Sequence, residues 1–232
     1  MNILWITLES ILPANSGGRL GVFKRLEQVA KTENIFLFYP YDSASEEQEI
    51  EELKKYCKEV HAYRRGENKI AALKEITKFP FTVGSRHIRT MQQDIQKCLD
   101  TNHIDVINVD FPHMCVNLLG IKTSVPIVLN EHNIEWKVYR TISSSQKHLL
   151  KKLLYWIDSY RLRKFEKRIF LQVPIRMVTF VSDKDMNYMV KNSQITQERS
   201  VLIPVGADQM TELPDKKHEG HNIMFVGKMS YG

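Results

Sequence analysis

The stretch from Asn2 to Gln28 constrains the fold of this chain more than any other. It opens with a short apolar run, Ile3 to Leu8, of the kind that is buried on both faces in a parallel sheet. A polar turn follows and leads to Ser16-Gly17-Gly18, after which one face of a helix carries Val22, Leu26 and Val29. A strand, a glycine loop and a helix in this order point free backbone N–H groups at an anion. The stretch therefore predicts an α/β unit whose loop faces an anionic ligand.

Two adjacent glycines, Gly17 and Gly18, let a backbone approach a ligand where a Cβ atom would collide. Their spacing matches neither G-x-G-x-x-G nor the P-loop, because no Gly-Lys-Ser/Thr follows. An ordinary turn explains the same two glycines, so both interpretations remain open at the level of this motif.

Composition indicates a globular protein in a reducing compartment. At 232 residues, the chain is long enough for one large domain or two small ones, and its 43% apolar and 26% charged residues are ordinary. Cys57, Cys98 and Cys115 are scattered and form no C-x-x-C, which argues against a disulfide framework or a zinc site. No apolar run is long enough to span a bilayer, and the N-terminus lacks the basic leader of a signal peptide. We expect a cytoplasmic protein.

The net charge of +6 is unevenly distributed. Residues 136–176 carry eleven Lys or Arg against only Asp158 and Glu166. Such a basic block points to an anionic partner, whether a membrane surface, a nucleic acid or a phosphorylated substrate. A solvated helix face is the alternative explanation.

Strands and helices alternate along the rest of the chain. Apolar runs predict strands at 35–39, 60–63, 105–109, 126–130, 177–181 and 201–203. Helical spacing predicts helices at 46–57, 68–78, 85–99, 116–119 and 144–171, and one that starts after Ser182 as its cap. This alternation predicts a Rossmann-like, doubly wound, mostly parallel α/β sheet with helices on both faces.

Ligands of such sheets bind outside the carboxyl ends of the strands. The polar side chains and glycines of this chain gather in the loops that follow strands: residues 9–18, 110–113 and 131–135, and Ser182. We therefore expect the functional site at this edge of the sheet.

The sequence changes character near its C-terminus. Residues 205–221 are polar and contain Pro214 and Gly220, as expected of a linker, and an apolar strand follows at 222–227. A lone strand cannot bury itself. We predict a domain at 1–204, a linker at 205–221, and at 222–232 the first strand of a second domain that is cut short.

Taken in order, these segments resemble the N-terminal half of a GT-B glycosyltransferase of the large retaining family 4. The resemblance rests on the loop from Pro13 to Arg19, Glu131-His132-Asn133, Phe165-Glu166-Lys167-Arg168, Phe180-Val181-Ser182-Asp183, Ile203 to Asp208, and Phe225 to Tyr231. It covers nearly the whole chain. Lys228-Met229 departs from it, because many members carry an Arg there.

The resemblance implies roles for the donor side of the site. Gly17 and Gly18 match the glycine loop whose backbone faces the nucleotide-sugar diphosphate, and Arg19 would add charge there or simply face solvent. His132 matches the histidine set against the donor sugar, and we take it as the catalytic candidate. The donor would be a UDP- or GDP-sugar, with no tightly bound cofactor and no metal. The family's main donor-binding residues lie in the second domain, so this chain alone is expected to be inactive.

The same resemblance makes this half the acceptor-binding side. Candidates to contact a glycan or lipid-linked acceptor are Asp110, His113, Glu131 and Asn133. Asp110 could act as a general base that takes the proton of the acceptor hydroxyl group. In retaining GT-B enzymes, however, the donor phosphate is usually regarded as the group that takes this proton. A capping or core role is an equal alternative for Asp110 and His113. Glu9 and Glu135 are weaker candidates.

Basic helices with interleaved aromatic residues in this half of the family often contact anionic membrane. Candidates here are Lys147, Lys151, Lys152, Trp156, Arg161, Arg163 and Lys164. Core packing of the apolar stripe formed by Leu149, Leu153, Trp156, Tyr160, Phe165 and Ile169 is the alternative. No aromatic platform or basic recognition motif favours nucleic acid.

The sequence thus predicts the acceptor-binding half of a retaining glycosyltransferase acting in cell-surface polysaccharide assembly, peripheral on the inner face of the membrane. Two alternatives remain: a non-catalytic module that docks on anionic membrane through the basic helix, and another GT-B enzyme such as a nucleotide-sugar epimerase.

Overall fold

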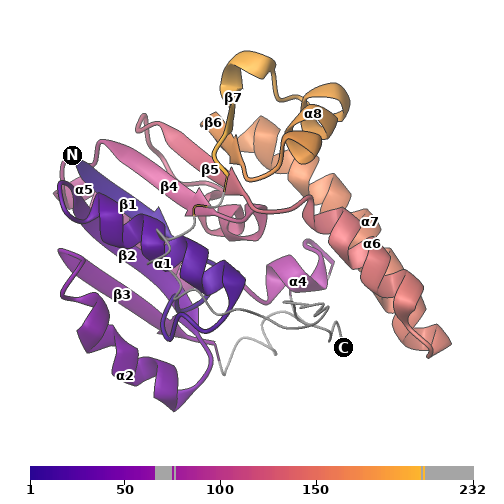
Figure 1. Ribbon diagram of the computed structural model, residues 1–232, viewed down its shortest axis with the longest axis horizontal. Helices are drawn as coiled ribbons and strands as arrows, with labels where there is room; N and C mark the ends of the chain where they lie inside the picture. The colour runs from indigo at the N-terminus through magenta and orange to yellow at the C-terminus, as the bar shows by residue number, and fades with distance from the viewer. Residues whose placement is uncertain (66–74, 76, 205, 207–232) are drawn as a thin grey trace, which may run out of the picture.

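A computed structural model describes residues 1–65, 75, 77–204 and 206, except the side chains of residues 44–46. It contains a seven-stranded sheet in the order β3-β2-β1-β4-β5-β6-β7, and every neighbouring pair is parallel (Figure 1). The strands are β1 Asn2–Ile6, β2 Asn34–Tyr41, β3 Glu59–Arg64, β4 Val106–Asp110, β5 Ile127–Glu131, β6 Ile175–Phe180 and β7 Ser200–Leu202. The predicted Rossmann-like, doubly wound α/β fold is confirmed.

Helices connect the strands, as parallel pairing requires. The α-helices among the described residues are α1 Gly17–Val29, α2 Ala44–Leu53, α4 Phe81–Gly84, α5 Arg89–Thr101, α6 Glu135–Ser145, α7 Leu149–Gln172 and α8 Asp183–Asn192. Two 3-10 helices complete this part of the chain: η1 Pro112–Leu118 and η2 Gln197–Arg199. Gly120 follows η1 with φ +84°, a left-handed conformation that suits glycine and turns the chain.

Alternate residues of the strands pack on opposite faces of the sheet, because side chains along a strand point alternately up and down. On β1, Ile3 and Trp5 belong to the apolar cluster that includes α1 and the end of α2. Leu4 and Ile6 belong to the cluster that includes η1, α5 and α7. The sheet is therefore covered by helices on both faces.

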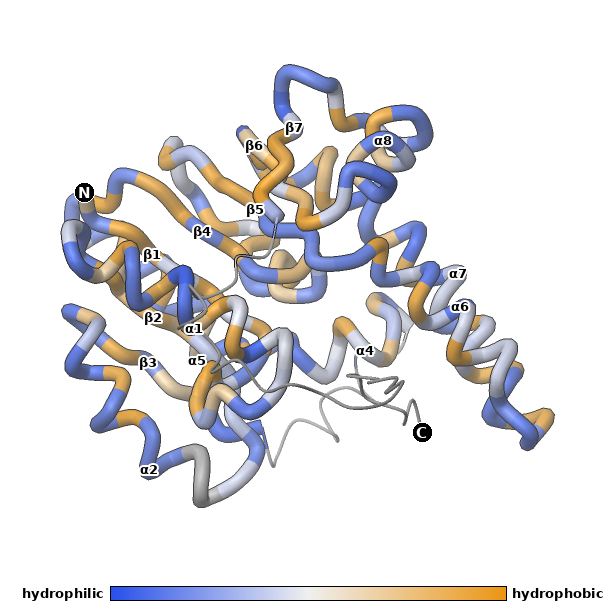
Figure 2. The backbone as a smooth tube through the Cα atoms, in the orientation of Figure 1, coloured by the Kyte–Doolittle hydropathy of each residue, from blue (hydrophilic) through white to orange (hydrophobic). Residues whose placement is uncertain are grey.

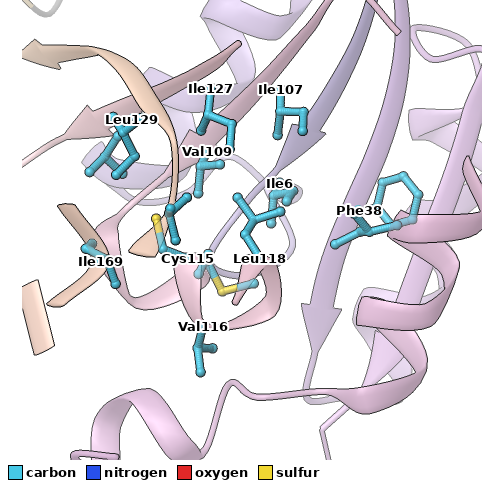
Figure 3. Packing of buried hydrophobic residues seen from close by; sticks show 14 of the residues in the cluster. Ile6, Phe38, Ile107, Val109, Cys115, Val116, Leu118, Ile127, Leu129 and Ile169 are labelled. Carbon is cyan, nitrogen blue, oxygen red and sulfur yellow. The ribbon is translucent and has the colours of Figure 1, made fainter. Parts of the chain in front are cut away.

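The larger cluster is centred on η1 (Figure 3). Cys115, Val116 and Leu118 of this 3-10 helix lie against the strand residues Ile6, Val109 and Leu129, and Ile169 of α7 closes the group. All seven are at most 3% exposed. Consequently η1, which follows β4 directly, is fixed in the core, and so is the polar loop at its start.

Several predicted boundaries were wrong. β2 continues through Pro40 to Tyr41, because Pro40 lies beyond the last residue paired with β1 and pairs only with Tyr63 of β3. The helix predicted at 85–99 starts at Arg89, because the extended Ile88 donates its N–H to the Asn117 side chain (2.9 Å). The segment predicted as one helix over 144–171 is split between α6 and α7, since Gln146 and His148 are extended.

Helices α6 and α7 form an antiparallel hairpin that projects from the body of the domain (Figure 1). The predicted single apolar stripe divides at this point. Phe165 and Ile169 are buried under the sheet, whereas Leu149, Leu153, Trp156 and Tyr160 are 82%, 53%, 43% and 52% exposed. Core packing therefore does not explain the outer half of α7.

The cap predicted at Ser182 is present. Its hydroxyl accepts a hydrogen bond from the Asp185 N–H at 3.4 Å, and Asp183 and Asp185 lie in the first turn of α8, where the helix dipole favours negative charge. Ser182→Ala is expected to lower the free energy of unfolding by about 1 kcal/mol in urea titration. Ser182→Asn restores the capping oxygen and serves as the matched control. Equal losses in both variants would contradict the capping role.

No helix among the described residues has the length and apolarity required to cross a bilayer. Most of the helix predicted at 68–78, the linker predicted at 205–221 and the strand predicted at 222–232 lie outside the described residues. The division of the chain into domains therefore stays a prediction.

Candidate functional site

The strand order reverses between β1 and β4, because the chain moves outward to β2 and β3 on one side and to β4 and beyond on the other. In open α/β sheets the crevice at this switch point, outside the carboxyl ends of the strands, is where ligands bind. Asp110 is the last residue of β4, and His132 comes one residue after the end of β5. The structure brings both predicted residues together there.

Asp110 is the centre of this site and is 0% exposed. One carboxylate oxygen, Oδ2, accepts from the indole Nε1 of Trp5 at 2.5 Å. The other, Oδ1, lies 2.6 Å from the Arg25 guanidinium and 3.0 Å from Nε2 of His132. Burial alone would raise the pKa of Asp110, but the His132 hydrogen bond and the Arg25 charge hold it below its usual value. Asp110 is therefore an ionised, fully partnered carboxylate.

The ring of His132 is fixed from two sides. It stacks on Phe111 with centroids 4.3 Å apart and planes 12° apart, and its Nε2 is held by Asp110. Phe111 has φ +68°, which is unfavourable for a residue with a Cβ atom and persists only where the surroundings hold it. Such strain is common at functional sites.

This arrangement defines what His132 can do. A carboxylate only accepts hydrogen bonds, so Nε2 carries a proton and Nδ1 is the nitrogen left to face a substrate. The Arg25 guanidinium lies 3.3 Å from the same Nε2, so the ring faces a carboxylate–guanidinium pair rather than a lone carboxylate. His132 is thus an oriented imidazole that can accept a hydrogen bond or a proton from a hydroxyl group.

The glycine loop lies on the surface at the start of α1. Ser16 is the N-cap and accepts from the Arg19 N–H at 3.4 Å, and Gly17 and Gly18 form the exposed first turn. Among the described residues, nothing lies within 4 Å of a Cβ atom added at either glycine. The described part of the fold therefore does not require these glycines.

Arg19 does not simply face solvent. Its guanidinium lies 2.9 Å from the Glu9 carboxylate and 3.4 Å from the Leu12 carbonyl oxygen, and its side chain is 16% exposed. The pair links the loop after β1 to the first turn of α1.

The other predicted acceptor contacts differ in exposure. Asn133 is exposed, whereas Glu131 and His113 are buried. Within the described part of the chain, the side-chain oxygens of Glu131 and the ring nitrogens of His113 have no hydrogen-bond partner. Burial raises the pKa of Glu131 well above its usual value, and the nearby charge of Glu166 adds to the effect. Burial also lowers the pKa of His113 well below its usual value. Both groups are therefore uncharged at neutral pH and lie beneath the surface.

Trp5 and Arg25 were not among the predicted site residues, and Phe111 was included only as part of the loop at 110–113. Trp5 reads as part of an apolar strand, and Arg25 as one of several charged residues on α1. Only the pairing of β1 with β4 brings Trp5 beside Asp110. No group of His, Cys, Asp and Glu side chains in the described part of the chain has the arrangement of a metal site.

No family model matches this sequence, and no curated protein matches it. Among solved structures, the fold is similar to that of TcCGT1 in complex with UDP, with a TM-score of 0.52 and 10% identity over 93% of this chain and 53% of that one. A second match is the N-terminal domain of Candida albicans trehalose-6-phosphate phosphatase, with a TM-score of 0.45 and 13% identity over 89% of this chain and 49% of that one. The chain spans about half the length of the structures it matches. By its fold, the chain corresponds to one Rossmann-like half of a GT-B structure.

Proposed function

We propose that this chain is the acceptor-binding half of a retaining, hexosyltransferase-type glycosyltransferase. The observation that carries the proposal is the Asp110–His132 pair at the switch point of the sheet, beside an exposed glycine loop. The similarity of the fold to TcCGT1, a protein seen with UDP, supports a nucleotide-sugar donor. The acceptor would be a glycan or a lipid-linked sugar, and the pathway cell-surface polysaccharide assembly in the cytoplasm.

Within this proposal the two parts of the site have separate roles. Backbone N–H groups of the glycine loop stabilise the negative charge that builds on the donor diphosphate as the glycosidic bond breaks. His132, oriented by Asp110 and Phe111, faces the donor sugar, where positive charge develops. The donor is a UDP- or GDP-sugar, and neither a tightly bound cofactor nor a metal takes part.

The test joins this chain to any continuation of its reading frame and measures turnover of a panel of UDP- and GDP-sugars. His132→Ala is expected to lower turnover of the accepted donor by about 10²-fold, the usual scale for a positioned histidine. Gly18→Trp is expected to block the loop without unfolding it, since no described residue lies within 4 Å of the added Cβ. His103→Ala is the matched control, because that histidine is 87% exposed and lies at the opposite edge of the sheet.

Equal turnover in His132→Ala and the parent would refute the proposed role. Interconversion of nucleotide-sugar epimers without transfer would favour the epimerase alternative. The alternative of a non-catalytic docking module predicts that no donor is consumed while membrane binding persists.

The α6–α7 hairpin supports the proposed membrane partner. The far end of the hairpin carries hydrophobic residues beside charged ones (Figure 2), and its exposed apolar side chains are Leu149, Leu150, Leu153, Leu154, Trp156, Ile157 and Tyr160. Arg140 lies over the Trp156 ring at 5.1 Å and Lys164 over the Tyr160 ring at 4.6 Å. Amphipathic surfaces of this kind bind the headgroup region of a bilayer.

Both acidic residues of α7 are turned away from this surface. Asp158 is buried and accepts hydrogen bonds from the Phe81 N–H (2.7 Å) and the Thr82 hydroxyl (2.9 Å). Glu166 is buried and accepts from the Trp136 N–H (3.3 Å). The exposed charges of α7 are therefore positive, and these include Lys151, Lys152, Arg163 and Lys164. Lys147 is exposed just before the start of the helix. Arg161 differs from these residues, because its guanidinium donates a hydrogen bond to the Phe79 carbonyl at 2.6 Å and so helps to hold α7 against the segment before α4.

Lys151→Glu combined with Lys152→Glu is expected to weaken binding to vesicles that contain anionic lipid at least tenfold, since each basic residue near such a surface contributes about 1 kcal/mol. Sedimentation with vesicles at low and high salt measures this. Lys31→Glu combined with Lys97→Glu changes the net charge equally on exposed sites outside the hairpin and should bind like the parent. Equal weakening by both double variants would mean that only net charge matters.

A further inference from the structure

Arg86 follows α4 and is held in place by several hydrogen bonds. Its backbone N–H donates to the Val83 carbonyl, and its carbonyl accepts from the Asn117 side chain, both at 2.9 Å. One arm of its guanidinium donates to the Thr82 carbonyl at 2.6 Å. Asp158 in turn fixes the first turn of α4. The position of this guanidinium is therefore set by the fold before any ligand arrives.

The charge of Arg86 lacks a direct counter-ion in the described part of the chain. No carboxylate there lies within 4.0 Å of the guanidinium, and its Nε is buried without a hydrogen-bond partner. Desolvation lowers the pKa of Arg86, and the titratable groups within electrostatic range are Tyr139, Arg65, Glu135 and Glu9. Arg86 is half-buried, and a partly desolvated cation without a counter-ion is unfavourable, so the described residues around it leave room for an anion.

The neighbours of Arg86 do not supply that anion. Glu9 is paired with Arg19, and Arg65 is paired with Asp42. Burial raises the pKa of Glu135 to about 7, so this carboxyl is only partly ionised at neutral pH. The guanidinium therefore keeps most of its charge uncompensated.

His113 adds uncharged hydrogen-bonding groups next to this cation. It is 2% exposed, neither ring nitrogen has a hydrogen-bond partner among the residues that the structure describes, and its ring centroid lies 6.2 Å from that of Tyr139. Arg86 and His113 lie within electrostatic range of each other. We name Arg86, His113, Glu135 and Tyr139 the Arg86 cluster; its members come from the end of α4, from η1 and from α6.

We propose that the Arg86 cluster binds an anionic group, a phosphate or a carboxylate, on the acceptor substrate. The guanidinium offers a fork of N–H donors that matches either group, and His113 and Tyr139 add hydrogen bonds to neighbouring oxygens. The assignment to the acceptor rests on the proposed function, in which the donor diphosphate is held by the glycine loop. Binding of the anion itself does not depend on that function.

The experiment is a calorimetric titration of this chain at constant ionic strength. The anionic probes are inorganic phosphate, glucuronate and a short-chain prenyl phosphate, and glucose is the neutral probe. At least one of the three anions is expected to bind to the parent, and glucose is not. The same anion should bind at least tenfold more weakly to Arg86→Gln. Arg89→Gln is the matched control, because Arg89 is 79% exposed and lies three residues away. Preference for the prenyl phosphate would identify a lipid-linked acceptor, and preference for glucuronate an acidic sugar.

A second measurement does not depend on the variant being folded. The Nε–Hε NMR signal of Arg86 in the parent is expected to shift on titration with the same anion. The proposal is overturned if no anion binds, if Arg86→Gln binds as tightly as the parent, or if the Arg86 signal does not respond. Displacement of phosphate by UDP would assign the site to the donor and also overturn it. Loss of transferase activity in His132→Ala, by contrast, tests only the proposed function.

Discussion

Asp110→Asn is expected to lower the free energy of unfolding by about 3 kcal/mol at pH 7, because it removes the buried carboxylate that three side chains share. Trp5 and His132 would each lose a charged acceptor, and the Arg25 guanidinium its counter-ion. We take the lower end of the range for broken buried ion pairs, since Arg25 is 32% exposed and can turn toward water. Urea unfolding followed by circular dichroism measures the loss.

The contacts of Asp110 with His132 and Arg25 also predict that stability depends on pH. The folded-state pKa of Asp110 is held below its ordinary value by His132 and Arg25 against the opposing effect of burial. Its contribution to stability is therefore complete above the unfolded pKa of about 3.9 and is lost as the pH falls through the folded pKa. The difference between parent and Asp110→Asn should accordingly shrink below about pH 4.

Asp42→Asn is the matched control for this prediction, because Asp42 pairs with Arg65 but is 59% exposed. A surface ion pair of this kind contributes about 0–1 kcal/mol. If the two variants lost the same stability, the burial of Asp110 would be irrelevant to its effect, and the site would not be held by this carboxylate.

Much of the fold could be predicted from the sequence, because parallel strands buried on both faces leave apolar runs that periodicity detects. The predicted helix boundaries were wrong where a tertiary contact determines where the helix begins or ends. Ile88 is apolar at helical spacing, yet the Asn117 side chain holds its N–H and delays the start of α5. The extended residues that separate α6 from α7 likewise carry no Gly or Pro to mark them.

The candidate site was only partly predictable for a related reason. Asp110 and His132 follow strands, so the rule for parallel sheets places both at one edge. Arg25 lies 85 residues from Asp110 in the chain, and nothing in the sequence around it indicates the contact. Glu131 and His113 were candidates for contact with the acceptor, with a core role as the alternative for His113, and the structure shows both side chains buried.

Glu166→Gln is expected to raise the free energy of unfolding by about 3–4 kcal/mol at pH 7, on the basis of about 1.4 kcal/mol for each unit between the unfolded-state pKa of about 4.3 and pH 7. Burial raises the pKa of Glu166 to about 8, so folding at pH 7 requires this carboxyl to take up a proton that the unfolded chain has released. Glutamine keeps the oxygen that accepts the Trp136 N–H but has no proton to take up.

The gain should grow with pH in a defined window. Between the ordinary glutamate pKa of about 4.3 and the folded value of about 8, the folded parent binds more protons than the unfolded chain, so its stability falls as the pH rises. Above that window both states are ionised and the difference is constant. Chemical unfolding at pH 4.5, 6, 8 and 9.5 should show the advantage of Glu166→Gln grow up to about pH 8 and then level off. Glu51→Gln, at a site 78% exposed, should show none.

Glu131→Gln should act in the same direction, since burial and the nearby charge of Glu166 both raise the pKa of Glu131. At pH 7 both carboxyls are protonated in the folded protein, so neither carries a charge that acts on the other. The gain of the double variant is therefore expected to equal the sum of the two single gains at pH 7. A gain smaller than the sum would show that one of the two carboxyls is ionised in the folded parent. A gain independent of pH would mean that Glu166 is ionised in the folded protein, where the charge of Arg163 favours the ionised form.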